Sequence, residues 1–152
     1  KNATYIDPES VRMSFTIINH FNILAENLFR EGRTEEAKKA LLKCMEVVPD
    51  KNHSLNFTIR KFYMVDLLYK LKEPKKANEI VANTAEYIED QLNYLAAIAK
   101  TKENLNTREV QLGVYVMTEL VKLTDQNGEK ELNKKLQDRL KVIESKFISA
   151  ER

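Results

Sequence analysis

Histidine, cysteine and carboxylate side chains are the groups in this sequence that could bind a metal ion or carry out nucleophilic and acid–base chemistry. Only two histidines are present, His20 and His53, and neither has acidic residues or cysteine around it at the spacing of metal ligands. Cys44 is the only cysteine, so the chain forms neither an internal disulfide nor a cysteine cluster. We therefore expect no metal site and no bound cofactor.

The carboxylates are numerous, but they alternate with lysines at helical spacing, as in Glu131 and Lys135. That pattern is typical of a solvated helix face, whereas paired catalytic acids need an apolar pocket that separates their pKa values. The three glycines are scattered and build no phosphate-binding loop. We expect no catalytic residues and no enzymatic activity in this region, and a packing role for Cys44.

Charge and composition narrow the class of protein further. The 25 basic and 23 acidic residues give a net charge of +2 and are interspersed along the chain. Nucleic-acid binding needs a basic face, so we expect no nucleic acid partner. No apolar run reaches the roughly 18 residues of a membrane span, so we expect no direct membrane insertion by this region. Three glycines and three prolines leave few turn signals, which favours an all-α fold.

The boundaries of the first two helices are marked by capping residues. Asp7, ahead of a proline, predicts a helix start, and the apolar spacing predicts that this helix runs to about Glu31. Gly32 predicts a left-handed C-cap, and Thr34 is expected to be the N-cap of a second helix that stops at Pro49. The buried residues are expected to be Val11, Phe15, Ile18, Phe21, Leu24, Ala25 and Leu28, then Ala37, Ala40, Leu41, Cys44, Met45 and Val48.

The first hairpin is followed by a second copy of its apolar pattern. A shift of 40 residues carries Leu24 onto Met64, and Asn56 is expected to cap the third helix. This repetition predicts a second helical hairpin. The other matching pairs are Ala25 with Val65, Leu28 with Leu68, Ala37 with Ala77, Leu41 with Val81 and Val48 with Ile88.

The first hairpin resembles the tetratricopeptide repeat, which implies a right-handed array of helical hairpins. The second copy is divergent, because Lys61, Lys72 and Glu89 stand where the aromatic residue, the glycine and the proline of that repeat belong. Its offset also exceeds the usual repeat of about 34 residues. The residues that carry the resemblance are Phe21-x2-Leu24-Ala25-x2-Leu28, Gly32, Ala37-x3-Leu41, Cys44 and Pro49.

The second half of the chain predicts three more helices. From Lys75 the apolar pattern predicts one helix of roughly 27 residues, with a break near Asp90 as the alternative. Asn106 or Thr107 is expected to cap the next helix, which ends at Asn127-Gly128, and a narrow apolar stripe makes the last one a C-terminal capping helix. The two stripes are Val110, Val114, Met117, Leu120 and Val121, and Leu132, Leu136, Leu140, Ile143 and Phe147.

These patterns predict one tetratricopeptide-like helical domain over residues 1–152, with about six helices. Its expected parts are repeat 1 at about 18–49, a divergent repeat 2 at about 57–89 and a C-terminal helical pair at about 105–147.

A second resemblance concerns a larger protein. The chain resembles the C-terminal soluble region of bacterial multi-pass membrane proteins that are similar to glycosyltransferases of the protein O-mannosyltransferase type. It implies a domain tethered to the inner membrane on the periplasmic side, with the catalytic part elsewhere; since the first residue is Lys1, we expect these residues to belong to a longer protein. The segments that carry it are Thr4-Tyr5-Ile6-Asp7-Pro8-Glu9-Ser10-Val11-Arg12, Leu24-Ala25, Cys44-Met45-Glu46, Lys76-Ala77-Asn78-Glu79-Ile80 and Gln91-Leu92-Asn93-Tyr94.

The tetratricopeptide resemblance also implies a concave face that binds a protein or peptide, or the membrane part of the parent chain. Phe29 and Tyr69 are the expected anchors, and Arg30 and Lys70 the orienting charges. In the alternative, both rings are covered as ordinary core, and the region is a structural appendage without a separate ligand. The expected contact residues are Asn19, Asn22, Glu26, Phe29, Arg30, Phe62, Asp66, Tyr69 and Lys70.

Overall fold

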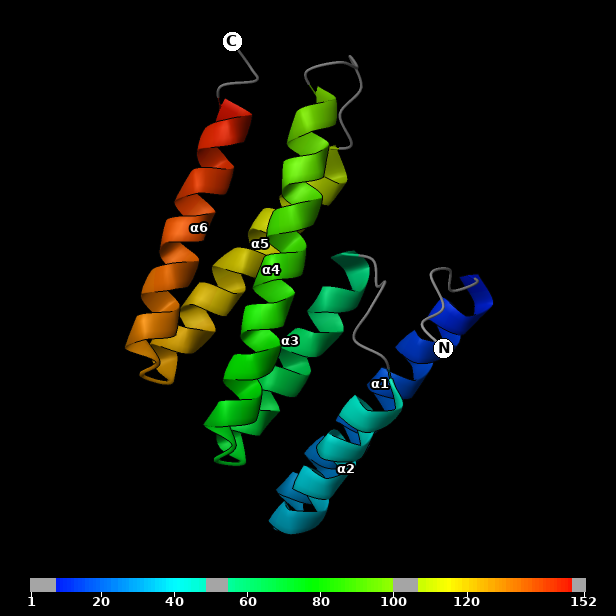
Figure 1. Ribbon diagram of the computed structural model, residues 1–152. Helices are drawn as coiled ribbons and strands as arrows, with labels where there is room; N and C mark the ends of the chain where they lie inside the picture. The colour runs from blue at the N-terminus through cyan, green and yellow to red at the C-terminus, as the bar shows by residue number, and fades with distance from the viewer. Residues whose placement is uncertain (1–7, 49–54, 100–106, 149–152) are drawn as a thin grey trace. The chain divides into compact units, whose positions relative to one another are not determined.

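The described part of the chain is helical in the computed structural model, which describes residues 8–48, 55–99 and 107–148 (Figure 1). No strand occurs in these ranges, and no helix within them is long and apolar enough to cross a membrane. The predicted all-α class with about six helices is confirmed. The helices are α1 (Pro8–Arg30), α2 (Thr34–Val47), α3 (Leu55–Lys70), α4 (Pro74–Ala99), α5 (Thr107–Gln126) and α6 (Lys130–Ile148).

The chain divides into two compact units, residues 1–77 and 78–152, and α4 begins in the first and continues through the second. This helix runs unbroken for 26 residues, so the long helix predicted from Lys75 is confirmed and the alternative break near Asp90 is excluded. A single domain over residues 1–152, and a tetratricopeptide arrangement of its hairpins, stay predictions.

Three helices end in the same left-handed turn. At the end of α1, Gly32 has φ 77°; its N–H bonds to the carbonyl three residues back, and the N–H of Arg33 bonds five residues back. The same two bonds follow α3 at Lys72, with φ 59°, and α5 at Gly128, with φ 75°. This pair of bonds is the Schellman motif, which satisfies carbonyls at a helix end. The left-handed C-cap predicted at Gly32 is confirmed.

The prediction that Thr34 is an N-cap is wrong. Thr34 is the first residue of α2, and Arg33 precedes it without a side-chain capping bond. The reason is that the turn passes directly into the helix, since the carbonyl of Arg33 already accepts the N–H of Ala37. Asn56, expected to cap the third helix, is the second residue of α3, because that helix begins at Leu55. The predicted boundary residues Asp7, Pro49 and Asn106 lie outside the described residues.

Most of the residues that the repeat pattern selects are buried, and all of the buried ones except Val81 and Ile88 belong to the first unit. Leu24 is exposed, at 48%, Phe15 and Phe21 are only half-buried, and the side chain of Val11 lies outside the described part of the structure. The helices packed on α1 are α2 and α3, and they cover the neighbouring face that carries Ala25 and Leu28. Met45 is half-buried. The residues confirmed as buried in the two copies are Ile18, Ala25, Leu28, Ala37, Ala40, Leu41, Cys44 and Val48, then Met64, Val65, Leu68, Ala77, Val81 and Ile88.

In the second unit, α4 and α6 run side by side in the same direction. Near one end, the side-chain amide of Asn78 donates to the carboxylate of Glu129 at 2.8 Å. Further along both helices, the ammonium of Lys146 donates to the side-chain oxygen of Asn93 at 2.7 Å. Because residue numbers increase in the same direction on both helices from the first contact to the second, α4 and α6 run parallel.

The buried face of α5 is broader than its predicted stripe. Gly113 lets α4 come close, because a Cβ atom there would lie 2.9 Å from a terminal methyl of the buried Leu92. Val116 and Leu123 are buried although the stripe omitted them. Of the residues in the stripes predicted for α5 and α6, four are buried and six are half-buried. The buried ones are Met117 and Leu120 in α5 and Leu136 and Ile143 in α6; the half-buried ones are Val110, Val114, Val121, Leu132, Leu140 and Phe147.

A candidate peptide groove between α1 and α3

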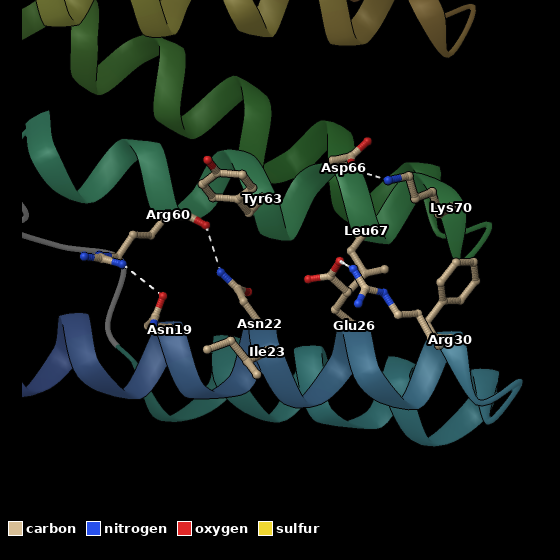
Figure 2. A pocket seen from close by; sticks show the side chains of 11 residues that line it. Asn19, Asn22, Ile23, Glu26, Arg30, Arg60, Tyr63, Asp66, Leu67 and Lys70 are labelled. Carbon is tan, nitrogen blue, oxygen red and sulfur yellow. Dashed lines mark hydrogen bonds and ion pairs between the residues drawn. The ribbon is translucent and has the colours of Figure 1, made fainter.

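A groove of about 460 Å³ lies between α1 and α3, within the first unit (Figure 2). It is large enough for several side chains of a peptide. Its walls come from successive turns of both helices, so positions three and four residues apart on each helix share its surface. The lining residues are Asn19, Asn22, Ile23, Glu26, Phe29 and Arg30 from α1, and Arg60, Tyr63, Asp66, Leu67 and Lys70 from α3.

Two hydrogen bonds join the walls at one end of the groove (Figure 2). The Nδ2 atom of Asn22 donates to the backbone carbonyl of Arg60 at 3.1 Å, and the Nη1 atom of Arg60 donates to Oδ1 of Asn19 at 3.1 Å. The Arg60 guanidinium also lies 5.6 Å from the centre of the Phe15 ring, within cation–π range. These contacts fix the spacing of α1 and α3 where the groove begins.

The side chain of Asn22 therefore braces the groove by bridging α1 and α3. Its donor group is engaged by α3, and its Oδ1 atom is buried and accepts no hydrogen bond from any residue that the structure describes. A buried acceptor without a partner is unfavourable, so the brace is made at some cost to stability.

The two walls repeat each other along the groove. The 40-residue shift found in the sequence relates lining residues of α1 to lining residues of α3 at three levels. Each wall then presents an apolar residue, an acid and a base in the same order, as the labelled side chains in Figure 2 show. The pairs are Ile23 with Tyr63, Glu26 with Asp66, and Arg30 with Lys70.

The charges at the far end of the groove are neutralised within each helix. Nη2 of Arg30 lies 2.6 Å from Oε1 of Glu26, and Nζ of Lys70 lies 2.6 Å from Oδ2 of Asp66. Both are exposed pairs four residues apart, which contribute only a few tenths of a kcal/mol, roughly, to helix stability. In the free protein the charges of Arg30 and Lys70 are thus balanced by carboxylates of their own helices.

An apolar section lies between the braced end and the ion pairs. Ile23 is 49% exposed and Tyr63 is 63% exposed, whereas Leu67 beside them is 7% exposed. The Phe62 ring meets the Tyr63 ring edge-on, with centroids 6.0 Å apart and planes at 77°, which supports the Tyr63 ring. An exposed aromatic residue beside a buried aliphatic one is typical of a contact surface.

Seven of the nine residues predicted to contact a partner line the groove, and Phe62 and Tyr69 do not. Phe29 is half-buried. Tyr69 is only 9% exposed, so its ring is not available as an anchor. The register is right for Asp66 and Lys70 on α3, but the face of α3 toward the groove is shifted from Phe62 and Tyr69 to Arg60, Tyr63 and Leu67. The seven are Asn19, Asn22, Glu26, Phe29, Arg30, Asp66 and Lys70.

Sequence reasoning missed four lining residues. Arg60, Tyr63 and Leu67 belong to one face of α3, since they and Lys70 recur at three- and four-residue steps. That spacing was visible in the sequence, and extending it backward from Lys70 would have found them. Ile23 was missed because the tetratricopeptide motif assigns the contact position to Asn22, the residue before it.

Among the described residues, Cys44 and His20, the groups considered for catalysis, do not line the groove. Cys44 is fully buried, and burial raises the pKa of its thiol to about 11, so the thiol is protonated and a poor nucleophile at neutral pH. His20 is exposed on α1, and His53 lies outside the described residues. Within the described ranges, no three His, Cys, Asp or Glu side chains gather where they could hold a metal ion.

No family model, curated protein or solved structure matches this chain. The assignment of a function therefore rests on the residues and geometry of the groove.

Proposed function

We propose that this chain is a non-catalytic helical-repeat module that binds a protein segment in the groove between α1 and α3. The observation that carries the proposal is the exposed pair Ile23 and Tyr63, with the buried Leu67 one turn further along α3, in a groove whose walls are braced by side-chain hydrogen bonds. A groove that is already spaced in the free protein loses little conformational entropy when a ligand enters. Its mixture of an apolar section and flanking charges suits a peptide.

The proposed architecture is a tetratricopeptide-like array. Its support is the left-handed turn that recurs at Gly32, Lys72 and Gly128 with the same two backbone hydrogen bonds, together with the 40-residue repetition of the groove lining. Stacked helical hairpins commonly present a concave surface to extended or helical peptides. Function does not follow from a fold alone, so the proposal depends on the groove.

Selection of peptides from a random displayed library on the purified 152-residue chain tests this function. Peptides that bind the groove should lose at least about tenfold in affinity to Ile23→Asp, because a carboxylate would then replace the apolar contact. Tyr63→Ala should weaken binding similarly. The matched control is Tyr115→Ala, which removes an exposed tyrosine of similar accessibility, 57%, in the second unit. Equal effects of Tyr63→Ala and Tyr115→Ala, or selection of no peptides, would contradict the proposal.

One observation favours a second candidate, a structural appendage that packs on its parent protein and binds no separate ligand. Tyr69, one of the two expected anchors, is buried. The second resemblance suggests the parent: a membrane glycosyltransferase-like protein, with this domain tethered to the inner membrane on the periplasmic side. Fractionation of the full protein with membranes, and digestion of the domain by protease added to intact spheroplasts, are the expected results. Protection from the protease would place the domain in the cytosol and contradict that location.

A further inference from the structure

The charges of the groove do not balance, and the excess lies at one place. Four of the five charged lining residues form the ion pairs Glu26 with Arg30 and Asp66 with Lys70. Arg60 is the fifth, and it faces no carboxylate within the part of the chain that the structure describes. Its positive charge is therefore the one that a ligand in the groove would have to match.

The Arg60 guanidinium is held in place before any ligand arrives. One nitrogen donates to Asn19, the plane lies over Phe15, and the backbone carbonyl of the same residue is bonded by Asn22. An arginine fixed in this way keeps N–H donors free in a planar fork, the geometry that binds a carboxylate with two parallel hydrogen bonds. Because the side chain is already ordered, less entropy is lost on binding.

The apolar section begins directly beside this cation. Tyr63 follows Arg60 by three residues on the same face of α3, and Ile23 lies opposite on α1 (Figure 2). Both side chains are about half exposed or more. A ligand that pairs with Arg60 therefore places its next side chains on an apolar surface.

A polyanion fits this surface poorly. Beyond the apolar section the groove presents Glu26 and Asp66 as well as their basic partners. If one phosphate of a polyanion paired with Arg60, the next phosphate would therefore lie near carboxylates that repel it. The chain as a whole carries a net charge of only +2, whereas nucleic-acid surfaces have a continuous basic face. One carboxylate followed by apolar side chains matches the groove better.

We infer that the groove takes a peptide segment with an internal acidic side chain next to an apolar one. The carboxylate pairs with Arg60, and the apolar side chain lies on Ile23 and Tyr63, with Leu67 one turn further along α3. This inference rests on the proposed function, because it assigns the chemistry of the peptide that the groove binds.

Peptides selected on the wild-type chain test the pairing through a double-mutant cycle. Arg60→Gln keeps the backbone carbonyl that Asn22 uses and a side-chain amide that can still donate to Asn19, so the groove should persist. Replacing the peptide acid by its amide, or Arg60 by Gln, should each weaken binding about tenfold. Both changes together should weaken it no further than either alone. Arg60→Lys should restore part of the affinity, since it keeps the charge but not the fork.

Arg12→Gln is the matched control, because Arg12 is an exposed arginine of α1 that does not line this groove; it should not change the affinity. If peptides lose affinity with Ile23→Asp and Tyr63→Ala but not with Arg60→Gln, the acidic pairing is overturned and the binding function stands. If amidation of the peptide C-terminus, and not of its acidic side chain, abolishes the Arg60 dependence, the internal acid is overturned. Insensitivity to all three groove substitutions would overturn the binding function itself.

Discussion

Gly32 and Lys72 occupy the same position in two turns with the same backbone hydrogen bonds. Gly32 has φ 77° and Lys72 has φ 59°, and in each turn the next residue donates to the carbonyl five residues back at 2.9 Å. The left-handed conformation costs a residue with a Cβ atom roughly 1 kcal/mol, and glycine avoids this cost. Lys72 therefore holds a conformation that glycine adopts more easily.

Replacing Lys72 with glycine should raise the free energy of unfolding by about 0.5–1 kcal/mol, because relief of the strained φ outweighs the added freedom of the unfolded chain. Urea unfolding followed by circular dichroism measures the change. Gly32→Ala is the control at the equivalent position; it should lower stability by about 1 kcal/mol. A less stable Lys72→Gly variant would contradict the equivalence of the two turns.

The helices and two of these turns were predictable from the sequence because their signals are local. Gly32 and Gly128 mark left-handed turns by residue type, and apolar spacing alone predicts the helices that they separate. The Lys72 turn carries no such residue, and only the 40-residue repetition pointed to it. Thr34 was misplaced because the choice between two neighbouring cap positions depends on the turn's backbone geometry.

The groove was predictable on one wall and only partly on the other. On α1 the tetratricopeptide register selected five lining residues. On α3 the same register correctly selected Asp66 and Lys70, but it also selected Phe62 and Tyr69 where the groove uses Arg60, Tyr63 and Leu67. The rotation of a helix about its axis depends on everything that packs against it, and a repeat pattern with a substituted motif does not determine it. The exposure of Leu24 has the same origin, because burial depends on which faces have neighbours.

Leu41 and Leu24 provide a matched pair for testing the core, since Leu41 is fully buried and Leu24 is 48% exposed. Leu41→Asp would bury an unpaired carboxylate among apolar side chains and should abolish cooperative folding of the first unit. Leu24→Asp should cost only about 1 kcal/mol, chiefly through lower helix propensity. Thermal unfolding curves distinguish the two. Similar losses for both variants, or a wild-type melting temperature for Leu41→Asp, would contradict the packing described here.

Asn133 should be intolerant of a charge. It is 7% exposed, and its Nδ2 atom donates to the carbonyl of Val121 at 2.6 Å and to Oγ1 of Thr124 at 3.1 Å. Asn133→Asp removes these donors and buries a carboxylate, so it should lower the free energy of unfolding by about 2–4 kcal/mol at pH 7. Asn133→Ala removes the same bonds without adding a charge, and should cost about 1 kcal/mol. Equal losses in urea unfolding would count against a buried, hydrogen-bonded amide at this position.

Cys44 should make the protein less stable at alkaline pH. Burial raises the pKa of its thiol from 9.0 to about 11 in the folded state. The unfolded chain therefore loses this proton first as the pH rises. The thiol's contribution to stability is constant below about pH 9 and is lost progressively between about pH 9 and 11.

Cys44→Ala should be less stable than the wild type at pH 7, through lost packing, but should lose less stability between pH 9 and 11. Tyr87, whose pKa is raised by burial and by the Glu109 carboxylate, titrates in both proteins, so the comparison isolates the thiol. Urea unfolding at a series of pH values provides the measurement. Parallel stability profiles for the two proteins above pH 9 would show that the Cys44 thiol is not buried as described.

The central claim, that the groove between α1 and α3 is a protein-binding surface, is tested most directly by nuclear magnetic resonance. A selected peptide is added to the isotope-labelled 152-residue chain, and the shift of each backbone amide is followed. The largest changes are predicted at Ile23, Arg60 and Tyr63, with little change around Tyr94 and Tyr115, which are also exposed. Changes centred on those two tyrosines, or on the exposed Met13 of α1, would contradict the claim.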